Sequence, residues 1–215
     1  MAFKLSQTGR DTLKSHEGIV PYVYDDKRGA RYKPTSWSDF QGYPTIGMGR
    51  LIQPSEFARF TPYLNGNRMS DSDLAVLIED TIRPRETQLN RLVGEAPITQ
   101  SMFDALFSLM YNTGAGNSSF KAAIRALTQR DEKGNWAPDY VAAQAAIANG
   151  PVTSKGQVLA GLVRRRKEEA FRFVADGFPG GAEGLLKSKT AKIGLAVIVS
   201  ALLATFLVRR SRRRR

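Results

Sequence analysis

A helix that is apolar on nearly every side is the feature that most constrains this fold. Residues 99–111 have helical spacing and carry the large apolar side chains Met102, Phe103, Leu106, Phe107, Leu109 and Met110. A helix without a polar face is stable only when other elements surround it. We therefore expect these residues to form the buried centre of a helical body, and 215 residues with 42% hydrophobic content suffice to build one.

The segment before this helical body has a different pattern. Residues 19–52 are rich in β-branched and aromatic residues interrupted by Gly and Pro, which is typical of short strands and turns. A helix over 6–17 should precede them, and a long polar loop over 25–41 should separate the strands. The sequence thus predicts an α+β fold, with a small β-hairpin lobe packed on a mainly helical lobe.

Within the helical part, local signals predict specific positions. Pro84 should break or kink the helix that contains it. Ser118 or Ser119 should cap a later helix. The last helix of the body should cover residues 161–174 and expose its basic run, 164–167, to solvent.

The positive charge of the chain is concentrated near its C-terminal end. The sequence has 32 Lys and Arg against 20 Asp and Glu, a net charge of +12. Nine of the basic residues and none of the acidic ones lie in residues 187–215, so the preceding 186 residues have a net charge of only +3. Such an excess indicates an anionic partner, and its position indicates where the chain is held rather than what it acts on.

An uncharged stretch of sixteen residues, Ile193 to Val208, lies just before the arginine-rich end, Arg209 to Arg215. As a helix it would be roughly 24 Å long, and its flanking cations could extend to the head groups of a bilayer with a core of ~30 Å. It has no polar face and follows a Gly- and Pro-rich stretch, which favours a membrane-associated helix over a buried one. We predict a folded main domain over 1–176, a linker over 177–188, and a transmembrane-type helix with its arginine-rich tail over 189–215.

The tail also predicts partners and location. Membrane lipid is the expected anionic surface and nucleic acid is disfavoured, because an apolar run lies beside the arginines. By the positive-inside bias, the domain that precedes the tail would lie on the face of the membrane opposite to the arginines. The first ten residues contain no apolar stretch of the length of a secretory signal. We expect a monomer.

The absence of Cys and the presence of a single His, His16, limit the chemistry. Disulfides, thiolate metal sites and His-based catalytic triads are excluded, so hydrolysis must use carboxylates, hydroxyls or amines. We predict no metal and no organic cofactor.

Three polar residues are candidates for a catalytic site. Glu17 lies at the predicted end of the first helix, Asp26 follows the first strand, and Thr45 lies on the returning strand. Two carboxylates in different environments, with a hydroxyl that positions water, are the minimum set for cleaving a glycosidic bond. From generic spacing alone, a structural role as helix-end and turn residues is the stronger interpretation. Asp25 is expected to be an exposed neighbour.

The order of the motifs resembles the bacteriophage-type lysozymes, the muramidases of glycoside hydrolase family 24. Glu-Gly ends the first helix at residue 17, an Asp follows nine residues later, and Thr-Ile-Gly-x-Gly begins at residue 45. Motifs at 99–106, 111–116 and 161–168 are also similar to the family, and the resemblance covers roughly residues 3–173.

This resemblance implies a lysozyme-like fold and hydrolysis of the β-1,4 bond between N-acetylmuramic acid and N-acetylglucosamine in peptidoglycan glycan strands. It implies that Glu17 protonates the leaving oxygen, that Asp26 orients or activates water, and that Thr45 holds that water. Two other activities stay open. One is lytic transglycosylation, and the other is a membrane-active or wall-binding role for a lysozyme-like body. The degradation would take place at phage lysis or at the start of infection, with the catalytic domain facing the periplasm and cell wall, in the envelope of an infected host or in a virion.

One departure from the family concerns the aspartate. The family has its Asp six residues before the Thr, whereas Asp26 is nineteen residues before Thr45. Asp39 has the six-residue spacing and follows Asp26 by thirteen positions, which corresponds to a thirteen-residue insertion. We favour Asp26 because it keeps its distance from Glu17, and Asp39 is the alternative. In the same loop, Trp37 either stacks on a sugar ring or packs on its own lobe.

Overall fold

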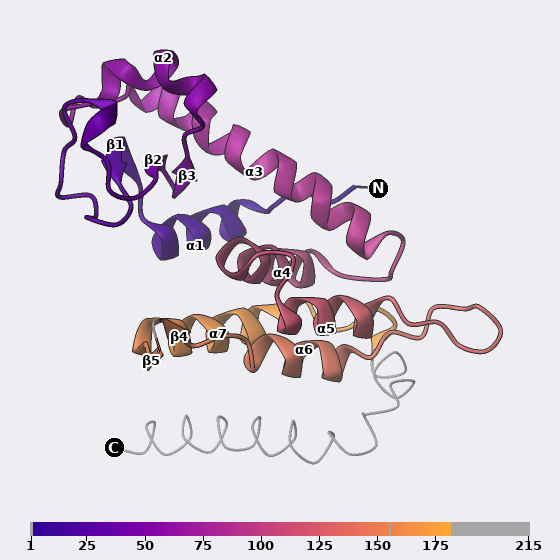
Figure 1. Cartoon of the computed structure of the whole chain (residues 1–215). Coiled ribbons are helices and arrows are strands. Elements are labelled where there is room, and N and C mark those ends of the chain that lie inside the picture. Colours follow the sequence, from indigo (N-terminus) through magenta and orange to yellow (C-terminus); the bar gives the residue numbers. More distant parts are fainter. Residues whose placement is uncertain (1, 155, 182–215) are drawn as a thin grey trace, which may run out of the picture. The chain divides into compact units, whose positions relative to one another are not determined.

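The computed structural model describes residues 2–154 and 156–181, which form two compact units (Figure 1). Residues 6–88 make up the sheet unit, and residues 2–5 together with residues from 89 onward make up the helical unit. The long helix α3 (Asp71–Val93) contributes residues to both. A small sheet and a mostly helical body confirm the α+β class.

The sheet unit contains one helix before its strands, as expected. Helix α1 (Gln7–Glu17) begins after Ser6, whose hydroxyl accepts the N–H of Gly9, and it ends at Gly18. Gly18 has a φ of +69°, a value that residues with a Cβ rarely adopt. Three antiparallel strands follow in the spatial order β1 (Val20–Asp25), β2 (Pro44–Gly47) and β3 (Arg50–Leu51). Short helical turns complete the unit: η1 (Trp37–Asp39), η2 (Pro54–Glu56), α2 (Phe57–Phe60) and η3 (Thr61–Tyr63).

Helix α3 holds the sheet unit together. A Cβ at Gly47 of β2 would lie 3.4 Å from Leu77 of α3, so β2 and α3 pack closely. From α1, the Arg10 guanidinium pairs with Glu79 and, at 3.2 Å, with Glu86. Of the two predicted effects of Pro84, the break is wrong, because α3 continues to Val93, and the kink stays a prediction. Buried side chains before and after the proline, among them Ile82 and Leu89, keep this helix in the fold despite the lost backbone donor.

The helical unit is built around α4 (Gln100–Thr113), as its sequence predicts. Residues 101–110 are all buried, and the Thr99 hydroxyl caps the helix by accepting the N–H of Met102. Helix α4 packs against α5 (Ser118–Leu127) and α7 (Ala160–Phe173), and α6 (Tyr140–Ala148) packs against both of these. A short hairpin of β4 (Thr153–Ser154) and β5 (Gln157–Val158) precedes α7.

The cap of α5 differs from the prediction. Asn117, rather than Ser118 or Ser119, accepts the N–H groups of Ser119 and Phe120. An asparagine at the N-cap position bonds the same free amides as a serine would, and here the helix begins one residue earlier.

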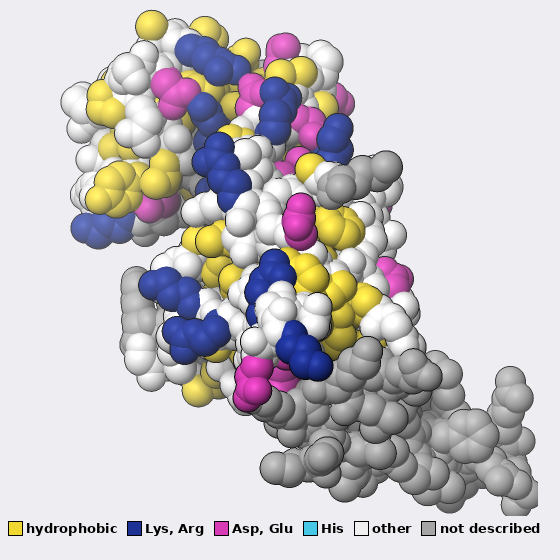
Figure 2. All heavy atoms as spheres, turned by 90° about the vertical axis from the view of Figure 1, so that its right-hand side faces the viewer, with side chains coloured by type: hydrophobic (Ala, Val, Ile, Leu, Met, Phe, Trp, Pro, Cys, Tyr) yellow, Lys and Arg dark blue, Asp and Glu magenta, His cyan; other side chains and the backbone are white. Residues whose placement is uncertain are grey.

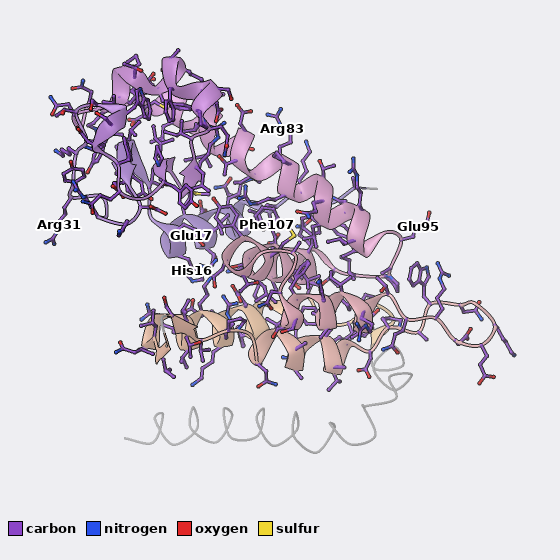
Figure 3. All side chains as sticks on the ribbon, in the orientation of Figure 1. His16, Glu17, Arg31, Arg83, Glu95 and Phe107 are labelled. Carbon is purple, nitrogen blue, oxygen red and sulfur yellow. The ribbon has the colours of Figure 1, made fainter. Side chains whose placement is uncertain are left out.

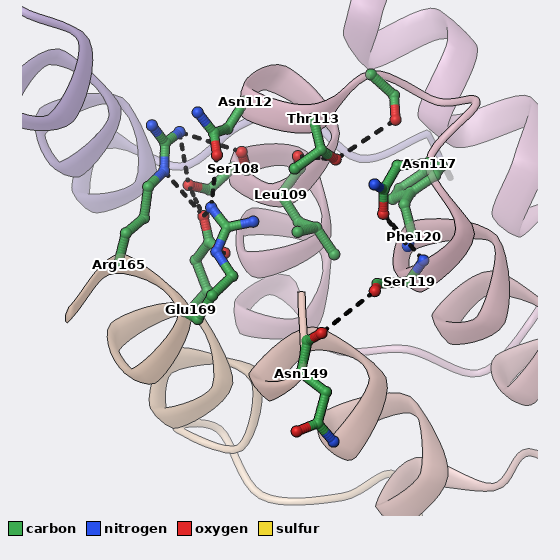
Figure 4. A network of polar contacts seen from close by, with 12 residues as sticks. Ser108, Leu109, Asn112, Thr113, Asn117, Ser119, Phe120, Asn149, Arg165 and Glu169 are labelled. Atoms are coloured by element: carbon green, nitrogen blue, oxygen red, sulfur yellow. Dashed lines mark hydrogen bonds and ion pairs between the residues drawn. The ribbon is translucent and has the colours of Figure 1, made fainter. Parts of the chain in front are cut away.

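The basic run of α7 is partly buried, so the prediction that all of it faces solvent is wrong. Arg165 is 5% exposed and Arg166 is 1% exposed, whereas the Arg164 side chain is 77% exposed. Glu169, itself 3% exposed, pairs with both buried arginines at 3.1 Å (Figure 4). Ser108 and Asn112 of α4 bond to Glu169 and Arg166, respectively. Burial of these cations is possible because the carboxylate offsets their charge.

Exposed charges of both signs are interspersed on the described surface. Figure 2 shows basic and acidic side chains side by side on the face that it draws, many of them on the sheet unit. Asp80 and Arg83, a surface pair at 3.4 Å on α3, are one example. This distribution agrees with the near-neutral charge of the chain before residue 187.

The predicted hydrophobic helix, its arginine-rich tail and most of the predicted linker lie outside the described residues. Residues 177–181 are described, and the Phe178 ring packs on Tyr140 of α6 with centroids 5.4 Å apart. Among the helices of residues 2–154 and 156–181, none is both long and apolar enough to cross a bilayer.

Candidate active site

One face of the small sheet carries most of the candidate residues. Along β1, Pro21, Val23 and Asp25 are buried, whereas the alternate residues are only half-buried. Tyr24 pairs with Thr45 across the β1–β2 ladder, so their side chains lie on the same face of the sheet. Asp26 continues this face two residues beyond Tyr24 and is exposed.

The peptide groups of Tyr43 connect Asp26 to Thr45. The backbone N–H of Asp26 donates to the Tyr43 carbonyl at 3.2 Å, and the Asp26 carboxylate accepts the Tyr43 N–H at 2.6 Å. The same carbonyl accepts the Thr45 hydroxyl at 3.0 Å. Thr45 is 2% exposed, so its hydroxyl is held in one orientation by this bond. Asp26 and Thr45 therefore bond to the same carbonyl, although Thr45 lies nineteen positions after Asp26 in sequence.

Glu17 lies at the end of α1, where Figure 3 labels it, and is half-buried. Glu17 and Asp26 both affect Tyr24, which lies between them in sequence. Burial raises the pKa of the Tyr24 phenol, and the negative charges of Asp26 and Glu17 raise it further. Both carboxylates thus lie within electrostatic range of the same hydroxyl. Tyr24 thus pairs with Thr45 across the ladder, and the charges of both Asp26 and Glu17 act on its phenol.

Tyr24 itself was not a predicted site residue. Its signal in the sequence was the alternation along β1, which places it on the same face as Asp26. Sequence patterning alone predicts only that such a tyrosine is half-buried, and its pairing with Thr45 comes from the return of β2.

Asp25 is buried, so the expectation of an exposed neighbour is wrong. It is 0% exposed, and its carboxylate accepts the backbone N–H groups of Lys27, Arg28, Gln41 and Gly42. Desolvation on its own would raise the pKa of Asp25, but these four donors together lower it below its ordinary value. A carboxylate can occupy an inward-facing strand position because the loop backbone replaces its lost hydration.

Asp39 lies in a different environment, inside the turn that begins η1. Its carboxylate accepts the N–H and hydroxyl of Thr35 and the N–H and hydroxyl of Ser36. The Ser36 amide and then the Thr35 hydroxyl are the main causes that lower the pKa of Asp39 to about 2. The acceptor sites of Asp39 are therefore used by its own turn.

Trp37 packs within the sheet unit. Its ring stacks on Phe57 with centroids 4.0 Å apart and lies 5.7 Å from Phe40, and its Nε1–H donates to the Thr61 hydroxyl. These contacts support the packing interpretation of Trp37 that the sequence left open.

Neither a metal site nor the cavity described next includes the candidate catalytic residues. The described residues contain no group of three or more His, Asp and Glu side chains that could hold a metal ion. A cavity of about 530 Å³ lies in the helical unit, along the loop that includes Gln129, Asp131 and Asn135. None of the candidate catalytic residues lines it.

A family comparison extends over most of the described chain. The model of the phage lysozyme family matches residues 14–169, a stretch that includes Glu17, Asp26, Asp39 and Thr45. The chain belongs to the phage lysozyme family. The resemblance inferred from the motifs is thereby confirmed, and the family match runs through both units.

Individual relatives are more distant. An endolysin of Bacillus phage B103 is 27% identical over 197 residues, which cover 90% of this chain and 63% of that protein. This chain thus spans less than two thirds of the length of that relative. Among solved structures, the muramidase domain of SpmX from Asticaccaulis excentricus matches with a TM-score of 0.53 at 22% identity, covering 80% of this chain and 98% of that one. An endolysin from Escherichia coli O157:H7 phage FAHEc1 matches with a TM-score of 0.51 at 24% identity, with coverages of 83% and 98%. These structures support the lysozyme-like fold.

Proposed function

We propose that this phage lysozyme family member is a peptidoglycan muramidase. It hydrolyses the β-1,4 bond between N-acetylmuramic acid and N-acetylglucosamine in the bacterial wall. The observation that carries the proposal is that Glu17, Asp26 and Thr45 all lie in the stretch that matches the family, with Asp26 and Thr45 bonded to the same Tyr43 carbonyl. Two carboxylates and a hydroxyl on neighbouring elements are the groups that glycoside hydrolysis requires.

In this mechanism Glu17 is the general acid. It donates its proton to the glycosidic oxygen as the bond to the muramic acid carbon breaks, so the sugar leaves as a neutral alcohol. Its place at the end of α1 fixes the backbone from which it reaches the substrate.

Asp26 is the second carboxylate, and it stabilises the positive charge that develops on the sugar while orienting or activating water. Its exposure leaves one side of the carboxylate open to substrate, while the Tyr43 N–H fixes the other. Thr45 holds the attacking water: its hydroxyl hydrogen is donated to the Tyr43 carbonyl, so the oxygen acts toward water as an acceptor. Asp39 has no such freedom, since four donors of its own turn surround it.

Three variants test the roles. Glu17→Gln should abolish the release of reducing sugars from purified peptidoglycan while leaving the far-UV circular dichroism unchanged. Asp26→Asn should reduce kcat by at least about 100-fold, the scale expected for loss of one catalytic group, and Asp39→Asn should keep most of the activity. A larger loss in Asp39→Asn than in Asp26→Asn would reverse the assignment of the aspartate.

The products distinguish hydrolysis from lytic transglycosylation. Water as the acceptor gives a reducing muramic acid end, whereas an internal attack gives a 1,6-anhydro end. Because this mechanism assigns Thr45 and Asp26 to hold water, we expect reducing ends in mass spectra of the digest. A product set dominated by the anhydro form would contradict the assigned mechanism.

We further propose that residues 189–215 hold the enzyme at an anionic membrane. The support is in the sequence: the uncharged stretch Ile193 to Val208 is followed by seven residues, 209–215, of which six are arginines. The full chain should sediment with vesicles that contain phosphatidylglycerol, and a chain ending at residue 186 should stay in the supernatant while degrading purified peptidoglycan at the same rate. Equal sedimentation of the two chains, or sedimentation of the full chain only with DNA, would contradict this attachment.

A further inference from the structure

We infer that Asp25 is a positioning residue for the reaction, because its buried carboxylate closes the loop between β1 and β2 and thereby fixes Asp26. This inference rests on the proposed muramidase function of Asp26. Asp25 does not itself reach the substrate, since it is 0% exposed, and it acts through its neighbours.

The carboxylate of Asp25 joins the two ends of one loop. Its Oδ1 accepts the N–H of Lys27 at 2.9 Å and of Arg28 at 3.4 Å, at the start of the loop. At the end of the loop, Oδ1 accepts the N–H of Gly42 at 3.1 Å and Oδ2 accepts that of Gln41 at 2.6 Å. One side chain therefore closes a segment of more than a dozen residues.

Only an ionised carboxylate satisfies this arrangement. All four partners are donors, and a carboxylate has two acceptor oxygens and no hydrogen of its own. An asparagine of the same shape would turn its NH₂ group toward one set of donors and leave those amides without an acceptor in a buried site. The lowered pKa of Asp25 is in keeping with these bonds.

The closure is transmitted to Asp26 through Gly42 and Tyr43. Gly42 bonds to Asp25 and is followed directly by Tyr43, whose N–H and carbonyl bond to Asp26 and whose carbonyl also bonds to Thr45. A Cβ at Gly42 would lie 2.1 Å from Oδ1 of Asp26 and 2.7 Å from Oδ1 of Asp25. The loop end thus touches both carboxylates, and no larger residue fits at position 42 unless they move.

Asp26 needs such support because it is exposed at the start of a long loop. Catalytic groups must be held within a fraction of an ångström of their working geometry, and a displacement of about 1 Å reduces the rate on the order of 100-fold. Arg31, farther along this loop, extends away from Glu17 at the outer edge of the sheet unit (Figure 3). The loop between β1 and β2 has only η1 as regular structure, so the two ends of this loop determine where Asp26 lies.

The test is a double-mutant cycle on the full chain with purified peptidoglycan. Asp25→Asn should lower kcat by about 10- to 100-fold with KM changed less than about twofold, at a temperature where circular dichroism shows the variant fully folded. In an Asp26→Asn background, the same substitution should cause no further loss, since its effect passes through Asp26. Independent, multiplicative losses would overturn the positioning role and leave a merely structural one.

Two further measurements separate this inference from the proposed function. Hydrogen exchange of the Gln41 and Gly42 amides should accelerate in Asp25→Asn, and unchanged exchange would overturn the closure whether or not the chain is an enzyme.

Asp131→Asn is the matched control, because Asp131 also accepts backbone N–H groups, from Lys133 and Asn135, in a loop of the helical unit. It should keep wild-type kcat. If Glu17→Gln is active, the proposed function fails, whereas full activity of Asp25→Asn alone overturns only the positioning role.

Discussion

Asp25 in the sheet unit and Glu169 in the helical unit are both almost completely buried, yet their surroundings differ in kind. Asp25 is 0% exposed and is surrounded by backbone amides from the two ends of a loop. Glu169 is 3% exposed and is surrounded by the Arg165 and Arg166 guanidiniums and the Ser108 hydroxyl. The pKa of Asp25 is lowered, whereas burial raises the pKa of Glu169 in spite of the two guanidiniums.

The difference shows what each kind of partner does for a buried charge. Backbone amides are fixed in place and carry no net charge, so burying them costs little beyond the carboxylate itself. Guanidiniums must be desolvated along with the carboxylate, which offsets much of the attraction. The backbone arrangement therefore suits a loop that must hold one geometry beside the proposed catalytic residue Asp26, and the ionic arrangement suits the packing of two helices.

The largest expected effect is the loss of the carboxylate between α4 and α7. Glu169→Ala leaves Arg165 and Arg166 buried without their counter-charge and should lower the free energy of unfolding by about 3–5 kcal/mol. Urea unfolding monitored by circular dichroism measures this. Arg164→Ala is the control on the same helix, because its side chain is 77% exposed, and it should change stability by less than about 0.5 kcal/mol. Similar effects of the two substitutions would remove the distinction between the buried pair and the surface.

A smaller effect is expected where Arg166 contacts the end of α6. A Cβ at Gly150 would lie 2.8 Å from Cδ of Arg166 and 3.1 Å from the Ile147 carbonyl oxygen. Gly150→Ala should therefore destabilise the chain by about 1–3 kcal/mol in the same urea titration. Gly161→Ala, at a position in α7 with nothing within 4 Å, should be neutral or stabilising by up to about 1 kcal/mol. A neutral Gly150→Ala would indicate that Arg166 is free to move.

The smallest effect concerns pH, and its sign differs between the two carboxylates. Asp25 has a lowered pKa, so its contribution to stability is present above its ordinary value of 3.8 and is lost as pH falls through the lower folded pKa. Glu169 has a raised pKa, so stability decreases as pH rises from its ordinary value of 4.5 through the higher folded pKa.

Unfolding free energies of Asp25→Asn and Glu169→Gln, measured from pH 3 upward against the native chain, test this difference. The deficit of Asp25→Asn should grow with pH, and that of Glu169→Gln should shrink. Two deficits that change with pH in the same direction would show that the two sites hold their charges in the same way.

Much of the fold could be predicted from local sequence. The apolar pattern of residues 99–111 predicts a buried helix, and residues 101–110 are buried in α4. Ser6 and Gly18 mark the two ends of α1, because capping and left-handed backbone are local properties. The errors arose where distant residues decide. Arg165 and Arg166 follow a solvent-facing pattern, and only Glu169, Ser108 and Asn112 make their burial possible.

The candidate site shows the same division between sequence and structure. Motif order in the sequence indicated Glu17, Asp26 and Thr45, and it determined the phage lysozyme family to which the chain belongs. The inserted loop obscured which aspartate accompanies Thr45, because spacing along a chain does not give distance across a loop.

The sequence by itself determined which residue types are available and in what order they occur. The tertiary structure alone decided that Asp25 lies inside and Asp26 outside. It also placed Tyr43 between Asp26 and Thr45 and required a glycine at position 42. The physical reason is that backbone hydrogen bonds between β1 and β2 bring together groups that lie far apart in sequence, and burial then fixes their charge and orientation.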